Sequence, residues 1–504
     1  MTNIRVTYSG LISFAISLIS VVTGLIFTVI ITRQLTAEEY GILGIIGGLT
    51  GYMLIVEPIV SYWATREIAR GEKSGKTALI TNTLFSFGTI PIFLLIVFLY
   101  HSQVDIDLNI LIFAVIMIPS RFLRHGLDSI NAGYKPQNVA YGLLIFELMK
   151  IPSALSLVFY LDMGIIGVII AITIASIAQI IFQIFIVRNV IRVSFDVKFI
   201  KKWIKLSWLP IYPRLAQNIT NSDIVIFSII VNSIELIAFW TVSMAIAGVI
   251  EHASSISKAV YPKLLSGGKR EFFQDNMNRV LYLSIPLVGM TIVFAKPSLF
   301  TLNPIYQEAV SIVIILSLSQ FLRMLNTTFT HSLTGIDEVD IDEKSNYKKY
   351  LKSKLFKLPT LKLIQRISYI LSLVIVLLIF TPIVDNKLDL VFYWAIITLA
   401  TQIPLTIIYY SMIKKDFSVK IGRESILKYL FSGTVVFTII HFLMDEFLVY
   451  NENIFKFLPD FFVFVISGII AYILLTYLID IRTKKLVKSI IIEIIKISGE
   501  YKKK

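Results

Sequence analysis

The sequence predicts an all-α polytopic membrane protein with about fourteen transmembrane helices. The chain has 504 residues, of which 56% are hydrophobic and only 16% are charged. The apolar residues gather in runs long enough to cross a bilayer as helices. A five-residue stretch also returns about 199 positions later in a similar setting, which indicates two copies of one helical bundle.

Charged or polar loops separate the expected helices. The first apolar run follows a short basic segment that contains Arg5, and it lacks a small-residue cleavage site. We therefore expect a first transmembrane helix there rather than a removable signal peptide. The helices are expected at roughly 9–32, 41–60, 78–100, 109–129, 139–161, 163–187, 207–230, 236–257, 280–301, 306–334, 363–382, 389–412, 425–444 and 457–480.

The loops alternate sharply in charge, and this alternation predicts the orientation in the membrane. About 38 of the 47 lysines and arginines fall on one side, whereas the other side carries Arg33, Lys296, Lys387 and Lys456. Basic residues concentrate on the cytoplasmic side of membrane proteins. We therefore expect a multi-pass protein of the cell (cytoplasmic) membrane with both termini in the cytoplasm. The net charge of +14 then reflects topology and contact with anionic lipid, not nucleic-acid binding.

Several classes of chemistry lack the residues that they need. Cysteine is absent, which excludes disulfides, thiolate metal sites and cysteine nucleophiles. The five histidines show no metal-ligand spacing, and neither a phosphate-binding glycine loop nor a G-x-S-x-G elbow appears. We therefore expect no enzyme, no metal and no organic cofactor, although a coupling ion such as H⁺ or Na⁺ stays open.

The repeated stretch is Ser-Arg-Phe-Leu-Arg at 120–124 and Ser-Gln-Phe-Leu-Arg at 319–323. Six helices per copy return the chain to the same side of the membrane. Two six-helix lobes would then be related by a pseudo-twofold axis along the membrane normal, with a cleft between them. We expect an N-lobe at 1–187, a cytoplasmic amphipathic linker at 188–206, a C-lobe at 207–415 with a hydrophilic cytoplasmic insertion at 336–362, two added helices within 416–480, and a basic cytoplasmic tail at 481–504.

Ionisable side chains at membrane depth are the candidates for function. Each costs roughly 2.5–3.5 kcal/mol at the centre of a membrane helix, so each needs a reason to be there. On the fourth expected helix, Arg121, Arg124, His125 and Asp128 follow the i, i+3, i+4, i+7 spacing that defines one helical face. The seventh and tenth helices carry similar polar stripes. We therefore expect a hydrated cationic cavity between the lobes.

Arginine suits an anionic head group because its planar fork can bind two phosphate oxygens at once. Three alternatives stay open: Arg121 and Arg124 could extend to the cytoplasmic surface, Arg214 could be an interfacial anchor that follows Pro210 and Pro213, and Lys150 could form an internal pair with Glu147. The candidates for binding phosphate or sugar are Arg121, Arg124, Lys150, Arg214, Asn218, Arg323 and Asn326.

Four carboxylates at membrane depth form a second set of candidates. They either bind a coupling proton or sodium ion, or neutralise the arginines, and we favour the second role. These residues are Glu57, Asp128, Asp223 and Glu251.

Several short stretches point to a known family. They are Thr32-Arg33-Gln34-Leu35 with Glu38-Glu39-Tyr40-Gly41, Thr65-Arg66-Glu67-Ile68-Ala69-Arg70, Arg124 through Tyr134, Leu209-Pro210-Ile211-Tyr212, Asn221 through Asp223, and Ala259-Val260-Tyr261-Pro262. Together they resemble the polysaccharide-biosynthesis membrane proteins, the O-antigen-type (Wzx-like) flippases. That family is part of a wider superfamily, together with lipid II flippases and multidrug and toxin extrusion (MATE) transporters, whose members share two six-helix lobes.

The chain departs from this family at two places. Glu57-Pro58 stands where an aspartate followed by glycine is expected, which keeps an acidic group but changes the local helix geometry. The insertion at 336–362 is the second departure.

The resemblance implies a flippase that moves a polyprenyl-(pyro)phosphate-linked oligosaccharide from the cytoplasmic to the outer leaflet by alternating access. Such lipids serve the assembly of cell-surface polysaccharides or glycoproteins. The resemblance further implies membrane lipids, glycosyltransferases and a polymerase or oligosaccharyltransferase as partners. We expect a monomer that binds no nucleic acid.

Two other classes stay open. A cation-coupled multidrug efflux antiporter could use the same fold, but arginine on three helices favours an anionic substrate over a cationic drug. A membrane-embedded glycan polymerase or transferase would need a catalytic loop, for which the short external loops leave no room.

Overall fold

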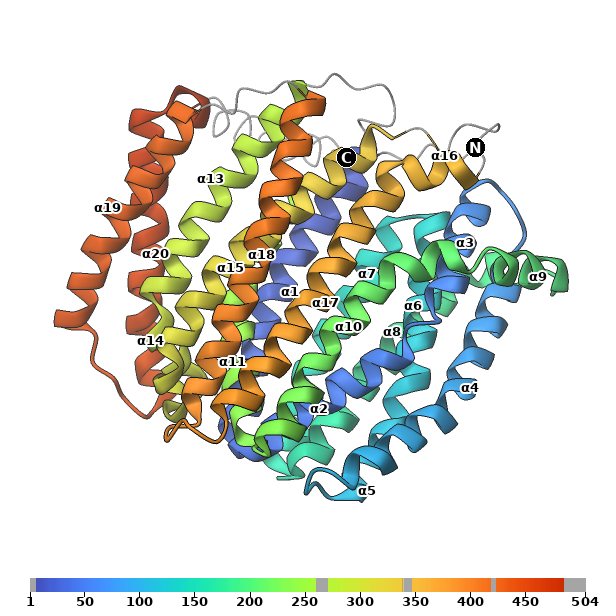
Figure 1. Ribbon diagram of the computed structural model, residues 1–504, viewed down its shortest axis with the longest axis horizontal. Helices are drawn as coiled ribbons and strands as arrows, with labels where there is room; N and C mark the ends of the chain where they lie inside the picture. Colours follow the sequence, from blue (N-terminus) through green and yellow to red (C-terminus); the bar gives the residue numbers. More distant parts are fainter. Residues whose placement is uncertain (1–5, 260–270, 338, 340–346, 418–422, 485–504) are drawn as a thin grey trace, which may run out of the picture. The chain divides into compact units, whose positions relative to one another are not determined.

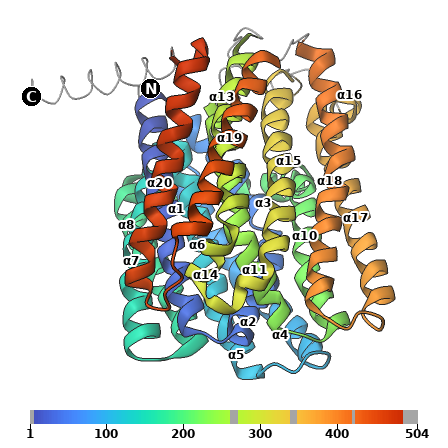
Figure 2. The same ribbon diagram turned by 90° about the vertical axis from the view of Figure 1, so that its left-hand side faces the viewer.

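The protein is built from helices (Figures 1 and 2). The structure is a computed structural model that describes residues 6–259, 271–337, 339, 347–417 and 423–484, and every regular element in these ranges is helical. The chain forms two compact units, Met1–Val242 with Phe356–Ile397, and Ser243–Leu355 with Thr398–Lys504. The predicted all-α fold class is confirmed, while the boundaries expected for the lobes stay a prediction.

Many of the helices are long and apolar enough to cross a membrane. In the described residues ten helices meet this requirement, or up to twelve if each of two bent pairs forms one span. All fourteen expected segments fall on a helix or a bent pair. Two of the fourteen expected segments are not among these twelve spans, namely α1 (Val6–Gln34) and α10 (Trp208–Val231). Polar residues interrupt the apolar sequence of α10. The protein is a multi-pass membrane protein, and the number fourteen is approximate.

The first unit contains the N-terminal helices and part of the C-terminal half. Within it, α7 packs against α1 and α8, while α6 packs against α3, α4 and α8. Besides α1 and α10, its elements are α2 (Ala37–Met53), α3 (Pro58–Ala69), α4 (Gly75–His101), α5 (Leu108–Phe113), η1 (Ala114–Ile116), α6 (Met117–Tyr134), α7 (Gln137–Ala154), η2 (Leu155–Tyr160), α8 (Gly164–Ile191) and α9 (Val197–Lys205), with most of α11 (Glu235–Ala247) and α17 (Lys354–Phe380) and part of α18 (Leu388–Phe417).

The stretch that resembles the flippase family begins α2. Thr36 accepts a hydrogen bond from the Glu39 backbone, and the Glu39 side chain accepts one from the Thr36 backbone at 3.0 Å. This reciprocal arrangement satisfies two amides at the helix start. Farther along, α2 and α3 meet at a bend of 62°, where Glu57 precedes Pro58. Proline is well accommodated at the first position of a helix, so Glu57-Pro58 begins α3 without disturbing it.

The second unit contains the remaining helices. Here α13 packs against η3, α15 and α19, and α19 packs against α20. The helices α13 and α14 form a second bent pair, with an angle of 68°. The elements of this unit are η3 (Gly248–Ala259), α13 (Glu271–Val293), α14 (Ala295–Leu302), η4 (Pro304–Ala309), α15 (Val310–Gly335), α16 (Tyr347–Lys352), α19 (Arg423–Phe447) and α20 (Ile454–Ile479), with the larger part of α18 from Thr398 onward.

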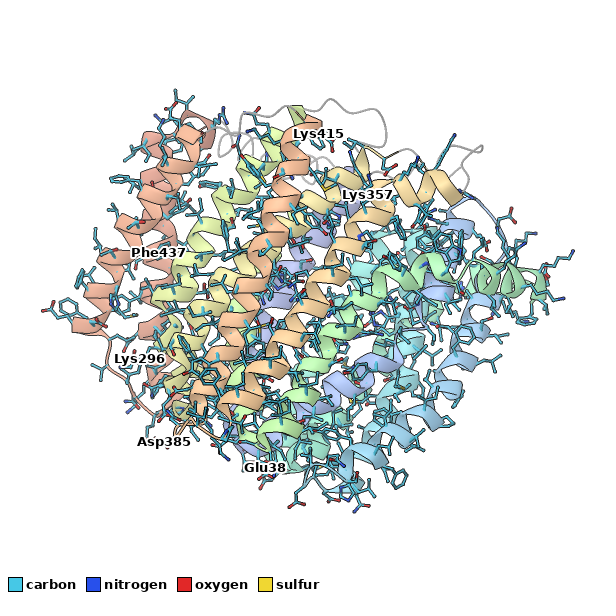
Figure 3. The ribbon with its side chains drawn as sticks, in the orientation of Figure 1. Glu38, Lys296, Lys357, Asp385, Lys415 and Phe437 are labelled. Carbon is cyan, nitrogen blue, oxygen red and sulfur yellow. The ribbon has the colours of Figure 1, made fainter. Side chains whose placement is uncertain are left out.

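Large apolar side chains are exposed along the outer helices. On α4, Leu84, Phe87 and Leu95 are each more than half exposed. Such faces suit lipid rather than water. In the first unit, Lys357 lies near the start of α17 and Asp385 follows its other end, and in the second unit Lys415 and Lys296 lie at opposite ends (Figure 3). Charged groups thus mark the ends of the apolar helices.

The three hydrophilic segments differ in how much of them the structure describes. In the linker expected at 188–206, α8 runs to Ile191 and α9 follows at Val197–Lys205. In the insertion, α17 already begins at Lys354, whose amide donates to Asp337 Oδ2 at 2.6 Å. Residues 338 and 340–346 of the insertion and the tail beyond residue 484 lie outside the described residues.

Candidate functional site: a membrane-depth cationic cluster

Helix α6 carries the polar stripe predicted for the fourth expected helix. Arg121, Arg124, His125 and Asp128 are all partly buried. Arg121 Nη1 donates to Thr50 Oγ1 on α2 at 2.6 Å. The Arg124 guanidinium lies over the Phe146 ring on α7, 4.8 Å from its centroid. Both arginines therefore contact neighbouring helices, and their role in substrate binding stays a prediction.

Asp128 is on α6, and its side chain contacts α8. Its Oδ1 accepts hydrogen bonds from Gln183 Nε2 at 2.6 Å and from Gln179 Nε2 at 3.3 Å. Both glutamines are almost fully buried in a predominantly apolar helix. Sequence reasoning missed this pair, although two amides at i and i+4 in such a helix were a usable signal.

Glu57 immediately precedes α3, and its side chain interacts with residues of α6 and α10. Its side chain is buried, accepts a hydrogen bond from Ser61, and interacts electrostatically with Arg214 and Asp128. The arginines of α6 and α10 also act electrostatically on His125, and they would repel its imidazolium form. We call this set the α6 cluster, and it consists of Glu57, Arg121, Arg124, His125, Asp128 and Arg214.

The α6 cluster has more guanidinium groups than carboxylates. Its three arginines outnumber Glu57 and Asp128. Glu147 on α7 also acts on Arg124, but Glu147 is already paired with Lys150. Within the described residues, Arg214 Nε is buried without a hydrogen-bond acceptor. A buried donor without an acceptor is costly, and an anionic ligand would supply one.

Lys150 and Glu147 form a buried ion pair on α7. Their charged atoms are 2.6 Å apart, and both side chains are less than one-tenth exposed. On α1, Ser20 Oγ and Thr23 Oγ1 donate to Glu147 at 2.9 and 2.7 Å. The Lys150 ammonium also lies 5.0 Å from the centroid of the Phe27 ring. The structure thus places Lys150 in the internal pair that the sequence left as one alternative.

Helix α10 holds two further candidates, Asp223 and Asn218. Asp223 Oδ2 accepts a hydrogen bond from Tyr369 Oη at 2.8 Å, and Tyr369 Oη accepts one from Trp394 Nε1 at 2.6 Å. The Trp394 ring stacks on that of Trp240, with centroids 3.8 Å apart. Aromatic groups therefore cover this carboxylate. Asn218 is 7% exposed, and in the described part of the chain its buried Nδ2 meets no acceptor.

The second unit carries the remaining candidates. Arg323 Nε lies 3.6 Å from Glu251 Oε1, and both side chains are partly exposed. Asn326 Nδ2 donates to Gln402 Oε1 on α18 at 3.2 Å. Glu251 thus lies within ion-pair distance of Arg323, and the roles suggested for both residues stay predictions.

Arg366 was not among the sequence candidates. It lies on α17 and is only 4% exposed. It falls near the start of the helix expected at 363–382, shortly after the basic end of the insertion, and was not singled out there. Only the packing of α17 reveals its burial.

Comparisons by sequence identify no relatives. No protein-family model matches the chain, and no curated protein matches it.

Solved structures of similar fold are membrane transporters. The chain is similar to the lipid II flippase MurJ in an inward closed conformation, with 18% identity, a TM-score of 0.65, and coverage of 94% of this chain and 99% of that chain. It is also similar to an inward-facing MATE multidrug resistance transporter, with 13% identity, a TM-score of 0.57, and coverage of 81% and 98%.

A third similar structure is a MOP superfamily transporter from Pyrococcus furiosus, described as having a binding pocket of reverse polarity that suggests a different function. The identity is 13%, the TM-score is 0.55, and the alignment covers 82% of this chain and 96% of that chain. These likenesses show that the chain has the fold of MATE transporters and MurJ. At identities of 13–18% the likeness concerns the fold and not the substrate.

Proposed function

We propose that the protein is a flippase for a polyprenyl-(pyro)phosphate-linked oligosaccharide, which it moves from the cytoplasmic to the outer leaflet by alternating access. The proposal includes the cytoplasmic membrane as its location and the cytoplasm as the site of both termini. The charge alternation of the loops supports this orientation.

The α6 cluster is the observation that carries the proposal. Arginine at membrane depth costs several kcal/mol unless something compensates it, and two carboxylates compensate three arginines only in part. A phosphate or diphosphate would supply the missing negative charge and acceptors for the buried Arg214 Nε. The excess of guanidinium groups over carboxylates therefore supports an anionic substrate.

The overall resemblance in fold supports the same proposal. The alignment with the lipid II flippase spans 94% of this chain. That protein is named for a lipid-linked substrate, and the same class of substrate fits a cationic cluster in a membrane bundle. The three similar structures are transporters, which supports transport over a glycan polymerase or transferase.

Such a flippase needs a path for the polar head and a force that moves it outward. The sugar and phosphate head would cross inside the protein while the polyprenyl tail stays in lipid. A negative-inside potential contributes about 2.3 kcal/mol per charge per 100 mV and would drive an uncompensated anionic head outward. If the arginines neutralise the head, the same potential would favour the return of the empty cationic site.

A cation-coupled efflux antiporter is the second candidate. Two buried carboxylates of the first unit, Glu57 and Asp223, support it, because such groups can bind a proton or a sodium ion. The similarity to a MATE transporter is compatible with it. The arginines of the α6 cluster oppose it, since they repel a cationic drug.

One experiment separates the two candidates. The purified protein is reconstituted in proteoliposomes, and movement of a fluorescent polyprenyl-diphosphate oligosaccharide is measured beside extrusion of a cationic dye under a proton or sodium gradient. We expect flipping of the lipid without dye movement. Dye extrusion that depends on the gradient, with no lipid flipping, would establish efflux instead.

A further inference from the structure

Helix α9 differs from the other helices of the first unit in both direction and composition. It lies across the end of α4, transverse to that helix, near the end of α3 (Figure 1). Nearby, the backbone of Asp196 donates to Thr77 Oγ1 on α4 at 3.0 Å. Because the membrane-crossing part of α4 begins at this level, α9 lies where the surface of the bilayer must be.

One face of α9 is fixed to the helix bundle. Trp203 is 1% exposed, and its Nε1 donates to Glu67 Oε2 on α3 at 3.1 Å. Lys202 Nζ donates to the other oxygen of Glu67 at 2.9 Å. The Phe199 ring stacks on Trp203, with centroids 5.9 Å apart. This anchoring holds α9 in place, so its other faces are available without rearrangement.

A second face of α9 is apolar and exposed. Val197 is 49% exposed and Ile204 is 54% exposed, and their spacing of seven residues puts them on one side of the helix. Phe195 and Trp208, which flank α9, are 40% and 41% exposed. Aromatic and aliphatic groups at the level where membrane helices end are typical of the lipid interface.

The third face is basic. Lys198, Lys201 and Lys205 follow a spacing of three and four residues and are exposed. No ion pair of these three side chains occurs among the described residues, whereas Lys202 is engaged by Glu67. The nearby Asp196 carboxylate accepts a hydrogen bond from the Lys198 backbone amide and caps the helix.

From this arrangement we infer that Lys198, Lys201 and Lys205 form a binding site for anionic phospholipid head groups, separate from the proposed transport site. The apolar face of α9 enters the acyl boundary while the lysines remain at the level of the phosphates. Lysines near an anionic surface each favour binding by about fivefold. The function of the site is to concentrate anionic lipid beside the ends of α3 and α4.

The absence of cysteine makes a direct test practical. In an otherwise unchanged chain, Ile204→Cys is labelled with a fluorophore, and the protein is reconstituted in phosphatidylcholine vesicles with or without phosphatidylglycerol. Quenching by lipids brominated on the acyl chain reports insertion of the apolar face. Energy transfer to acceptor-labelled phosphatidylglycerol, compared with acceptor-labelled phosphatidylcholine, reports head-group selectivity. Glu72→Cys, at an exposed position between α3 and α4, is the water-facing control.

Two triple variants then identify the site. Lys198→Gln/Lys201→Gln/Lys205→Gln should remove the selectivity for phosphatidylglycerol by at least fivefold. The matched variant Lys357→Gln/Lys414→Gln/Lys415→Gln removes three exposed lysines elsewhere and should leave the selectivity unchanged. The selectivity of the two triple variants is compared only if thermal unfolding shows that both are as stable as the unchanged protein.

Three results would overturn the inference. The first is an equal loss of selectivity in both triple variants, because net charge would then explain it. The second is no quenching of the Ile204→Cys label by brominated lipid, because α9 would then face water or a protein partner. The third is unchanged selectivity in the α9 variant.

Discussion

Gly44 on α2 lies directly against Thr241 on α11. A Cβ atom at position 44 would be 2.9 Å from Thr241 Oγ1 and 3.2 Å from Ile237 Cγ2. The two helices approach closely because glycine leaves the space that a side chain would fill. If the protein works by the proposed alternating access, we expect this contact to separate in one half of the cycle.

A disulfide at this contact is predicted to stop transport. In Gly44→Cys/Thr241→Cys the two Cβ atoms fall within about 4.5 Å of each other, which a disulfide can bridge. Oxidation should reduce lipid flipping in proteoliposomes to the level of empty vesicles, and a reductant should restore it. The native chain has no other thiol to confuse the result.

Gly47→Cys/Thr241→Cys is the matched control. Position 47 lies one turn farther along α2, and a Cβ there has nothing within 4 Å, so no cross-link should form. Full flipping by the oxidised Gly44→Cys/Thr241→Cys protein, with the disulfide confirmed, would show that these helices do not separate during transport.

Replacing Gly41 with alanine is predicted to destabilise the protein. The new Cβ would overlap the backbone oxygen of Ile234. Overpacking of this kind costs about 1–3 kcal/mol. Gly47→Ala meets open space and should be neutral or gain up to about 1 kcal/mol from helix propensity. Thermal unfolding in detergent tests this, and equal melting temperatures for the two variants would contradict the packing.

The sequence was sufficient to predict the helices and part of the site. Long apolar runs located all fourteen segments, because crossing a bilayer imposes a minimum length and an apolar composition that few other structures share. Helical spacing likewise predicted that Arg121, Arg124 and Asp128 share one face of α6. These features depend only on local order along the chain.

Contacts between distant segments could not be predicted in the same way. Asp223 and Tyr369 lie 146 positions apart, and no local pattern indicates that the tyrosine covers the carboxylate. The interaction of Glu57 with Arg214 likewise depends on how α3 packs against α10. The bend between α2 and α3 was also missed, since the apolar run continues through it.

The ion pair of Glu147 and Lys150 is predicted to be structural. Lys150→Met alone leaves a buried carboxylate unpaired, which typically costs about 3–5 kcal/mol. Glu147→Gln/Lys150→Met removes both charges and should regain most of the stability and the flipping rate. Thermal unfolding and flipping are measured on the same preparations. A double variant that is stable but inactive would show instead that Lys150 contacts the substrate.

Asp480 is predicted to make stability depend on pH. Burial disfavours its charge, but the Thr483 amide and hydroxyl, the Tyr429 hydroxyl and Lys428 outweigh burial and hold the pKa of Asp480 below its usual value. A lowered pKa in the folded state stabilises the protein above the unfolded pKa of about 3.9, and this contribution is lost as the pH falls through the folded value.

Asp480→Asn should therefore lower the melting temperature at pH 7 and converge with wild type below about pH 4. The control is Asp460→Asn, at an exposed position on α20, which should match wild type throughout. A difference between Asp480→Asn and wild type that stays constant from pH 7 to pH 3 would contradict a role for the charge.

The most direct test of the proposed function is the initial rate of flipping of a polyprenyl-diphosphate oligosaccharide by Arg124→Gln and Arg214→Gln in proteoliposomes. A charge-assisted hydrogen bond contributes about 1.5–3 kcal/mol, so each variant should flip at least about tenfold more slowly than wild type. Arg192→Gln, at an exposed position beyond α8, should flip normally. Wild-type rates in both cluster variants, at equal insertion and thermal stability, would contradict a cationic site for the phosphate.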